Sequence, residues 1–158
     1  MTTQLLRPQV TTCQVSSNGD QSELTIFRVR HTDPLGWKLM PDLLDRMTRF
    51  VVRLGLQTPL DKFSLYVRAH WATGSSLVGI WAAMQGGKLV GHALGIVEYC
   101  WDVPVATIVQ VDMDQDVPVP VSMRQLYVED MKGWARAQGI TTMNMLTTIV
   151  RATSRPRP

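Results

Sequence analysis

Several side chains that could bind a metal or act as a nucleophile occur in this sequence, but they are scattered along it. His31, His70 and His92 have no cysteine or carboxylate at the spacing of a metal site. Cys13 and Cys100 form no metal-ligand pair and no disulfide framework. The sequence also lacks the Gly-x-Ser-x-Gly turn that presents a nucleophilic serine. We therefore expect no metal, and the sequence shows no complete catalytic site.

Three arginines lie on one face of a predicted helix, where they could meet an acidic partner or nucleic acid. Arg46, Arg49 and Arg53 recur at helical spacing, but Asp42 and Asp45 are interleaved with them. This mixture is typical of a solvated, salt-bridged helix face. The formal net charge is only +3, which does not imply a nucleic-acid surface. We expect no nucleic-acid partner.

The composition is that of one folded domain. The chain has 158 residues, of which 45% are hydrophobic and 18% are charged. It is long enough to bury its own core, and its low charged share suits a protein whose surface is partly covered. No apolar stretch has the length of a membrane span, and no basic segment followed by an apolar run marks a secretory leader. We expect a cytoplasmic protein without a membrane partner.

Three regions differ in composition. Residues 1–22 are rich in threonine, serine, glutamine and asparagine, which predicts a flexible N-terminal arm. Residues 23–150 carry the hydrophobic periodicity of the domain itself. Residues 151–158 alternate arginine with proline near their end, which predicts a basic tail that cannot continue a strand.

The periodicity predicts an α/β (α+β) domain with the order strand, helix, helix, three strands, helix, strand. The first strand covers residues 23–30 and is closed by turn residues at 32–36. The first helix begins at Pro41 and ends before Gly55, with its apolar residues three and four apart. The other elements are a helix over 60–73, strands over 77–84, 88–100 and 105–113, a helix over 122–139 and a strand over 141–149.

Local signals define several element boundaries. Thr58 is a candidate N-cap for the second helix, with Pro59 at the first helical position. Gly86 and Gly87 indicate a tight hairpin turn. Ser122, followed three residues later by Gln, has the spacing of a capping box for the third helix. Because that helix is long enough for a crossover, we expect the last strand to lie parallel to the strand before it.

Two segments resemble the GNAT family of acyl-CoA-dependent N-acetyltransferases. They are Lys-Leu-Val-Gly-His-Ala-Leu-Gly-Ile at 88–96 and Trp-Ala-Arg-Ala-Gln-Gly-Ile at 134–140. The order of elements over residues 24–149 agrees with this family as well. The resemblance implies a GNAT-like mixed sheet. The family continues with another helix, which often supplies a tyrosine as general acid, and with two more strands. We expect these elements to be lacking here.

The resemblance also implies where acetyl-CoA would bind. In the family, a glycine-rich loop before the third helix holds the coenzyme A pyrophosphate through backbone N–H groups and the helix N-terminus. Matched backwards from Trp134, that loop has no glycine here, but it contains Pro118 and Pro120 together with Asp114 and Asp116. Proline lacks the N–H donor and the acids repel phosphate. The loop is therefore a degenerate acyl-CoA site.

Individual site residues follow from the same resemblance. Ser122 and Arg124 are the candidates to bind a phosphate, and the strand backbone at Val111 would border the acyl group. The family's general base is a carboxylate on the central strands, for which Glu98 and Asp112 are the candidates and Asp114 is a further one. Each also has a simpler explanation as a solvated or strand-end side chain.

Two functions remain open. The first, which we favour, is a noncatalytic acetyltransferase-like module that acts in protein assembly, with a protein partner or a second copy covering an open sheet edge. Degenerate GNAT-like domains occur among bacteriophage internal virion proteins, so a virion protein is one form of this expectation. No cofactor is then expected. The alternative is an acyl-CoA-dependent N-acetyltransferase that uses acetyl-CoA to acetylate an amine.

Overall fold

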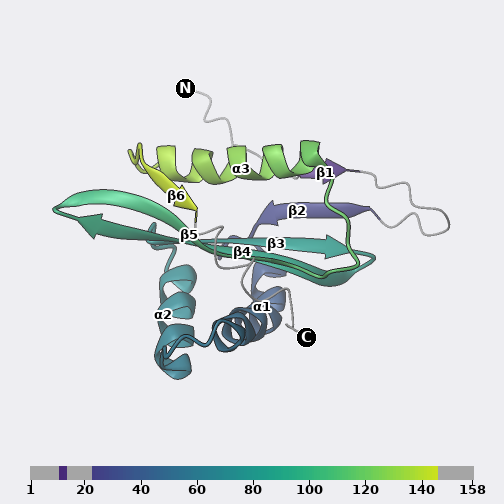
Figure 1. Cartoon of the computed structure of the whole chain (residues 1–158), viewed down its shortest axis with the longest axis horizontal. Coiled ribbons are helices and arrows are strands. Elements are labelled where there is room, and N and C mark those ends of the chain that lie inside the picture. Colours follow the sequence, from purple (N-terminus) through teal and green to yellow (C-terminus); the bar gives the residue numbers. More distant parts are fainter. Residues whose placement is uncertain (1–10, 14–22, 146–158) are drawn as a thin grey trace, which may run out of the picture.

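The computed structural model describes residues 11–13 and 23–145, which form six strands and three helices (Figure 1). In chain order they are β1 (Thr11–Cys13), β2 (Leu24–Arg28), α1 (Pro34–Arg53), α2 (Leu60–Ala72), β3 (Val78–Gln85), β4 (Lys88–Cys100), β5 (Val103–Met113), α3 (Val121–Arg136) and β6 (Met143–Met145). From β2 onward this is the predicted order. We expected the chain to lack the helix and two strands with which the family continues. That prediction concerns a part of the chain outside the described residues.

The strands form one mixed sheet in the order β1-β2-β3-β4-β5-β6. All neighbours are antiparallel except β5 and β6, which are parallel and paired through Ala106↔Met143 to Ile108↔Met145. Helix α3 connects β5 to β6 and covers the sheet, which is the crossover that a parallel pair requires. The parallel placement of the last strand is therefore confirmed.

Helices cover both faces of the sheet (Figure 1). Helices α1 and α2 pack on one face around Leu43, Met47 and Val67, together with residues of β3 and β4. Helix α3 packs on the other face, where the Trp134 side chain lies over the paired glycines Gly79 and Gly95. A Cβ atom on either glycine would lie within 3.0 Å of the Trp134 ring. Because these glycines have no side chain, the indole can sit directly on the strands.

Two hairpin turns join the central strands. Gly86 and Gly87 have φ values of 58° and 74°, so the predicted tight turn between β3 and β4 is confirmed. The β4–β5 turn, Trp101 and Asp102, has φ values of 53° and 63° although neither residue is glycine. L-residues other than glycine, asparagine and aspartate rarely adopt this region, so the Trp101 backbone is strained.

Two bulges set which side chains of β4 and β5 face helix α1. Val90 is an extra residue on β4, since Gly91 pairs with Ala83 and Leu89 with Met84. Val109 is an extra residue on β5, between the pairs Leu94↔Gln110 and Gly95↔Ile108. A bulge shifts the alternation of side chains by one residue. The polar residues His92, Gln110 and Asp112 consequently share the face covered by α1.

Helix α1 begins earlier than predicted. The turn residues after β2 do not form a separate loop, because Asp33 caps the helix and its carboxylate accepts a hydrogen bond from the Leu35 N–H at 3.0 Å. Pro34 occupies the first turn, and Pro41 lies inside the helix with its ring on the exposed side. The sequence prediction placed the start of the helix at Pro41, although Asp33 and Pro34 already provide an N-cap and a first-turn proline.

Three further predictions of local structure were wrong. The N-cap of α2 is Pro59 rather than Thr58, and no side chain caps it. Ser122 is not a capping residue either, since α3 begins at Val121 and Pro120 is its N-cap. Residues 11–13, expected in a flexible arm, form β1 and pair with β2, because two β-branched threonines suit a strand beside an open edge. Of the last predicted strand, 141–149, residues 143–145 form β6, and residues 146–149 lie outside the described residues.

These caps generate a test with a matched pair of variants. Asp33→Ala removes the carboxylate that accepts from the Leu35 N–H, so we expect the free energy of unfolding to fall by about 1 kcal/mol. Ser122→Ala removes a hydroxyl that caps nothing, so its change should stay below about 0.5 kcal/mol. Urea unfolding followed by circular dichroism measures both values. Equal losses in the two variants would contradict this assignment of the caps.

Candidate functional site

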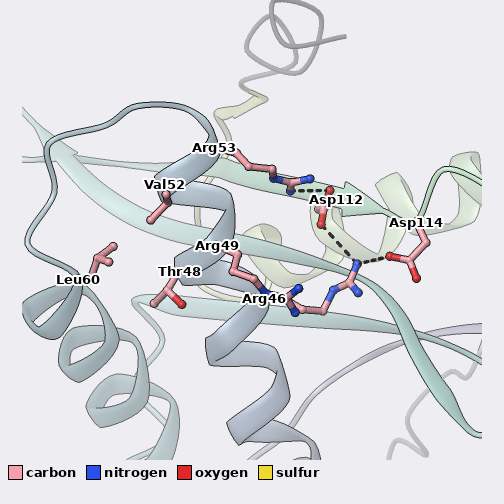
Figure 2. A pocket seen from close by; sticks show the side chains of 8 residues that line it. All are labelled: Arg46, Thr48, Arg49, Val52, Arg53, Leu60, Asp112 and Asp114. Carbon is pink, nitrogen blue, oxygen red and sulfur yellow. Dashed lines mark hydrogen bonds and ion pairs between the residues drawn. The ribbon is translucent and has the colours of Figure 1, made fainter.

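Four charged residues from α1 and the end of β5 form an ion-pair cluster, which we call the Arg46 cluster: Arg46, Arg53, Asp112 and Asp114 (Figure 2). Arg46 Nη2 lies 3.4 Å from Asp112 Oδ2 and 3.0 Å from Asp114 Oδ1. Arg53 Nη2 lies 3.0 Å from Asp112 Oδ1. Both carboxylate oxygens of Asp112 therefore face an arginine, and the cluster as a whole is neutral.

Arg46 also binds the backbone of the sheet. Its Nη2 donates to the carbonyl of Val90, the bulge residue of β4, at 3.2 Å. The same carbonyl accepts the Asp114 N–H at 2.8 Å, which fixes the start of the loop after β5. The Arg46 side chain is only 12% exposed, and its Nε atom is buried without a hydrogen-bond partner among the described residues. Arg46 thus links one helix, two strands and a loop.

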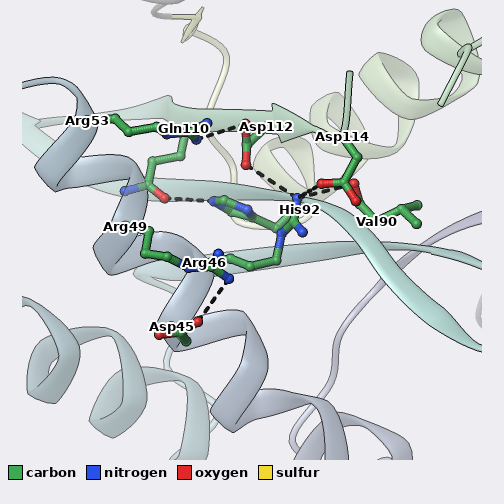
Figure 3. Close-up of polar contacts among 9 residues, drawn as sticks. All are labelled: Asp45, Arg46, Arg49, Arg53, Val90, His92, Gln110, Asp112 and Asp114. Carbon is green, nitrogen blue, oxygen red and sulfur yellow. Dashed lines mark hydrogen bonds and ion pairs between the residues drawn. The ribbon is translucent and has the colours of Figure 1, made fainter. Parts of the chain in front are cut away.

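His92 and Gln110 form a buried polar pair beneath this cluster (Figure 3). Gln110 Nε2 donates to the Met47 carbonyl at 3.2 Å, so its Oε1 is the acceptor that faces His92 Nε2 at 2.8 Å. His92 must then carry its proton on Nε2, which leaves Nδ1 as a lone-pair acceptor with no partner among the described residues. Burial lowers the pKa of His92, against a smaller opposite effect of the Gln110 hydrogen bond.

A pocket of about 470 Å³ opens beside the Arg46 cluster. Helix α1 forms one wall, the first residue of α2 another, and the end of β5 the third. Its lining includes arginines, aspartates, the Thr48 hydroxyl and the apolar side chains of Val52 and Leu60 (Figure 2). The arginines that line it are already paired with carboxylates. The pocket therefore has no strong preference for one sign of charge.

The structure does not bring the two candidate bases together. Asp112 pairs with His92 across β4 and β5, whereas Glu98 pairs with Val105 near the hairpin turn. Glu98 lies six positions after His92 on β4, which corresponds to about 20 Å along a strand. Glu98 is exposed at that distant end, and Asp112 is held by two arginines. Their roles as bases stay predictions, and the two cannot serve one site.

The candidate cofactor residues lie closer to one another. Val111 is half-exposed on β5 opposite Ala93. Ser122 and Arg124 are exposed in the first turn of α3, with no side-chain partner among the described residues. The first backbone N–H of this helix to find an acceptor is that of Arg124, which donates to the Pro120 carbonyl at 3.1 Å. The preceding N–H groups of residues 121–123 are free to bind an anion.

The loop before α3 fits a pyrophosphate poorly. Pro118 and Pro120 supply no N–H, and the Val117 N–H is used by the Asp114 carbonyl at 3.1 Å. Asp114 and Asp116 place two carboxylates on the same short loop. The helix N-terminus thus has N–H donors for an anion, but the loop before it adds few.

The residues that the structure brings together here were not predicted from the sequence. The charge pattern predicted a solvated helix face for all three arginines of α1, which is correct only for the exposed Arg49–Asp45 pair at 2.9 Å. Arg46 and Arg53 instead cross to β5. A signal was available, because His92, Gln110 and Asp112 interrupt strands that are otherwise apolar, and buried polar residues need partners.

The described residues contain neither a membrane-spanning helix nor a metal-binding cluster. No helix there combines the length and apolar character needed to cross a membrane. No group of three or more histidine, cysteine, aspartate or glutamate side chains among them is placed to hold a metal ion.

The Arg46 cluster can be tested with two neighbouring arginines of one helix. Arg46→Met leaves Asp112 and Asp114 without a partly buried cation, so we expect the free energy of unfolding to fall by about 2 kcal/mol or more. Arg49→Met removes only an exposed pair, so its change should stay below about 0.5 kcal/mol. Urea unfolding at constant ionic strength measures both. Similar values for the two variants would contradict a structural role for the cluster.

Protonation of His92 predicts a pH dependence of stability. Because its pKa is lower in the folded chain than in the unfolded chain, the unfolded state takes up the proton first as the pH falls below about 6.5. Stability should therefore be full above that pH and decrease below it. Between about pH 7.5 and about pH 5.5 we expect the parent chain to lose about 1 kcal/mol more than His92→Gln. The same pH dependence in both chains would contradict this prediction.

Comparison with known proteins finds likeness in structure but not in sequence. No protein-family model matches the sequence, and no curated protein matches it. A predicted acetyltransferase with acetyl-CoA from Clostridium acetobutylicum superposes with a TM-score of 0.59 at 9% identity, over 85% of this chain and 91% of that one.

Two other solved structures show the same likeness. The aminoglycoside acetyltransferase meta-AAC0020 from an uncultured soil metagenomic sample has a TM-score of 0.53 at 14% identity, over 85% of this chain and 90% of that one. A possible acetyltransferase from Clostridium difficile 630 has a TM-score of 0.55 at 12% identity, over 82% and 86%. At such identities the likeness establishes the fold alone. The chain has the GNAT-like fold of the N-acetyltransferases.

Proposed function

We propose that this chain is a noncatalytic acetyltransferase-like module that acts in protein assembly. The proposal rests on the end of β5, where a base would be needed, and on the loop before α3, where a cofactor would bind. Asp112 is held between Arg46 and Arg53, and the adjoining loop has two prolines and two carboxylates in place of glycines. Both carboxylate oxygens of Asp112 are thus occupied by arginines, so neither is free to contact a substrate amine.

An exposed hairpin supports assembly. The tip of β4 and β5 projects past β3 and β6, whose pairing ends at Ile96 and begins at Ala106 (Figure 1). Its side chains Tyr99, Trp101 and Val103 are 67%, 97% and 57% exposed. Large aromatic side chains are enriched where proteins bind one another. The strained Trp101 backbone is a further reason to assign this tip a role outside the fold.

The partner that fits this tip best is a second copy of the chain or another protein, rather than a small molecule. The hairpin is convex, whereas small molecules bind in concave sites. Its outer backbone edges beyond Val97 and before Ala106 are unpaired within the described residues, so a neighbouring strand could extend the sheet there. The first arrangement to test is self-association, since it needs only this chain.

The second candidate function is an acyl-CoA-dependent N-acetyltransferase. It is favoured by the free N–H groups at the start of α3, with Ser122 and Arg124 beside them. The neighbour from Clostridium acetobutylicum was solved with acetyl-CoA. A cytoplasmic chain would fit this activity, while either a cytoplasmic or a virion protein would fit the first.

One pair of measurements separates the two functions. We expect titration calorimetry with acetyl-CoA to show no saturable binding up to about 1 mM, and light scattering to give a mass above the 17.7 kDa of one chain. Changing Trp101→Asn and Asp102→Gly together supplies the residues preferred in this turn, so this variant should be at least as stable but should dissociate to monomers. Leu65→Ser, a change at a 68% exposed residue of α2, is the control that should still associate.

The opposite results would overturn the proposal. Micromolar binding of acetyl-CoA that is lost in Arg124→Met would support the acetyltransferase. A parent chain that stays monomeric at all concentrations would rule out self-association through the hairpin.

A further inference from the structure

A second, smaller pocket lies where the chain leaves β2 and where α2 turns into β3. Its volume is about 220 Å³, and every ionisable side chain that lines it is basic or a histidine. Its polar lining consists of Arg28, Arg30, His31, Thr32 and Ser75, and Trp71 contributes an apolar wall. Arg28, Trp81, Ala93 and Val111 lie opposite one another across the sheet. Three strand spacings, or about 14 Å, therefore separate Arg28 from the candidate cofactor strand.

Arg28 is a partly buried cation that forms no hydrogen bond or ion pair among the described residues. Burial lowers its pKa, and the charge of Arg30 lowers it further, against a smaller opposite effect of Asp130. Asp130 therefore acts on Arg28 from a distance. It lines no part of the pocket, and it accepts the Trp81 indole N–H at 2.6 Å.

The other hydrogen-bond acceptors near the pocket already have partners. Asp33 is the N-cap of α1 and accepts the Leu35 N–H. At the end of α2, the Trp71 and His70 carbonyls accept the N–H groups of Gly74 and Ser75. The Ser75 hydroxyl contacts His70 Nδ1 at 3.0 Å. Outside the described residues the sequence contains only one acidic side chain, that of Asp20. The chain itself therefore offers little to pair with Arg28.

The missing partner follows from charge and size. A partly buried arginine is unfavourable unless an anion pairs with it, and the guanidinium binds carboxylate and phosphate oxygens in a two-pronged geometry. Pockets for drug-sized molecules start at about 300 Å³, so this smaller one suits a single anionic group. Phosphate has more oxygens than a carboxylate and presents them on all sides, so it suits a pocket where two guanidinium groups and a hydroxyl approach from different directions.

We propose that this pocket binds a phosphate group, held by Arg28 and Arg30 with His31 and the Thr32 hydroxyl beside it. This site is separate from the start of α3 and does not depend on the assembly function. Inorganic phosphate and a small phosphomonoester both fit this description, since both present the same oxygens to the two arginines.

The experiment uses the full chain with sodium phosphate, glycerol phosphate and sodium chloride at equal ionic strength. Proton NMR follows the imidazole signal of His31, which is assigned by its absence in His31→Gln, and thermal unfolding follows stability. We expect both phosphates, but not chloride, to shift the His31 signal in a saturable way and to raise the unfolding midpoint. Saturation by inorganic phosphate alone would assign the site to free phosphate, and saturation by both would assign it to phosphate groups in general.

Variants decide whether the binding occurs in this pocket. Arg28→Met keeps the apolar part of the side chain and should weaken phosphate binding about tenfold or more. The exposed Arg30→Gln should weaken it several-fold, and this variant has little reason to misfold. Lys132→Gln, a change at an exposed residue of α3, should leave binding unchanged. Equal effects of phosphate and chloride, or unchanged binding in both pocket variants, would each overturn the proposal. Loss of binding in Arg124→Met would also overturn it, because the phosphate would then bind at the start of α3.

Discussion

The Arg46 guanidinium connects more of this molecule than any other described side chain. From helix α1 it reaches the carbonyl of a bulged residue in β4, the carboxylate of Asp112 in β5 and the carboxylate of Asp114 in the following loop. These contacts depend on two bulges that bring His92, Gln110 and Asp112 to the face under α1. The start of the loop and one wall of the 470 Å³ pocket therefore depend on one partly buried cation and its partners, which add to the apolar packing of α1 on the sheet.

This arrangement shows why a fold does not by itself establish an activity. The sheet and helices are those of N-acetyltransferases, with TM-scores of 0.50 or above for all the neighbours described. Yet the carboxylate at the end of β5 is paired with two arginines, and the loop that would hold a pyrophosphate has prolines where N–H donors are needed. At the start of α3 the chain has free N–H groups with a serine and an arginine beside them. One scaffold can thus carry different chemistry.

The arginines of the Arg46 cluster and those of the smaller pocket differ in whether carboxylates compensate their charge. In the Arg46 cluster each partly buried cation meets a carboxylate, so the cluster is satisfied without any ligand. Arg28 and Arg30 lie together with no such compensation from the residues that line their pocket. The hairpin tip likewise leaves Trp101 almost fully exposed, although burying such a side chain would be strongly favourable. Unsatisfied groups of this kind indicate partners better than satisfied ones do.

Much of the architecture could be predicted from the sequence, because it depends on local periodicity and turn residues. Such signals predict the strands from β2 to β5 and helices α2 and α3. They also predict the Gly86-Gly87 turn and the parallel β5–β6 pair. Bulges, in contrast, insert one residue without a sequence signature, and only pairing across strands reveals them. The tertiary structure alone decided that Arg46 and Arg53 bind Asp112, and that Glu98 and Asp112 lie far apart. It also decided that Arg28 and Arg30 line one pocket with no acidic side chain in its lining. Ion pairs and pockets join residues distant in the chain, and their partners are chosen by packing rather than by spacing.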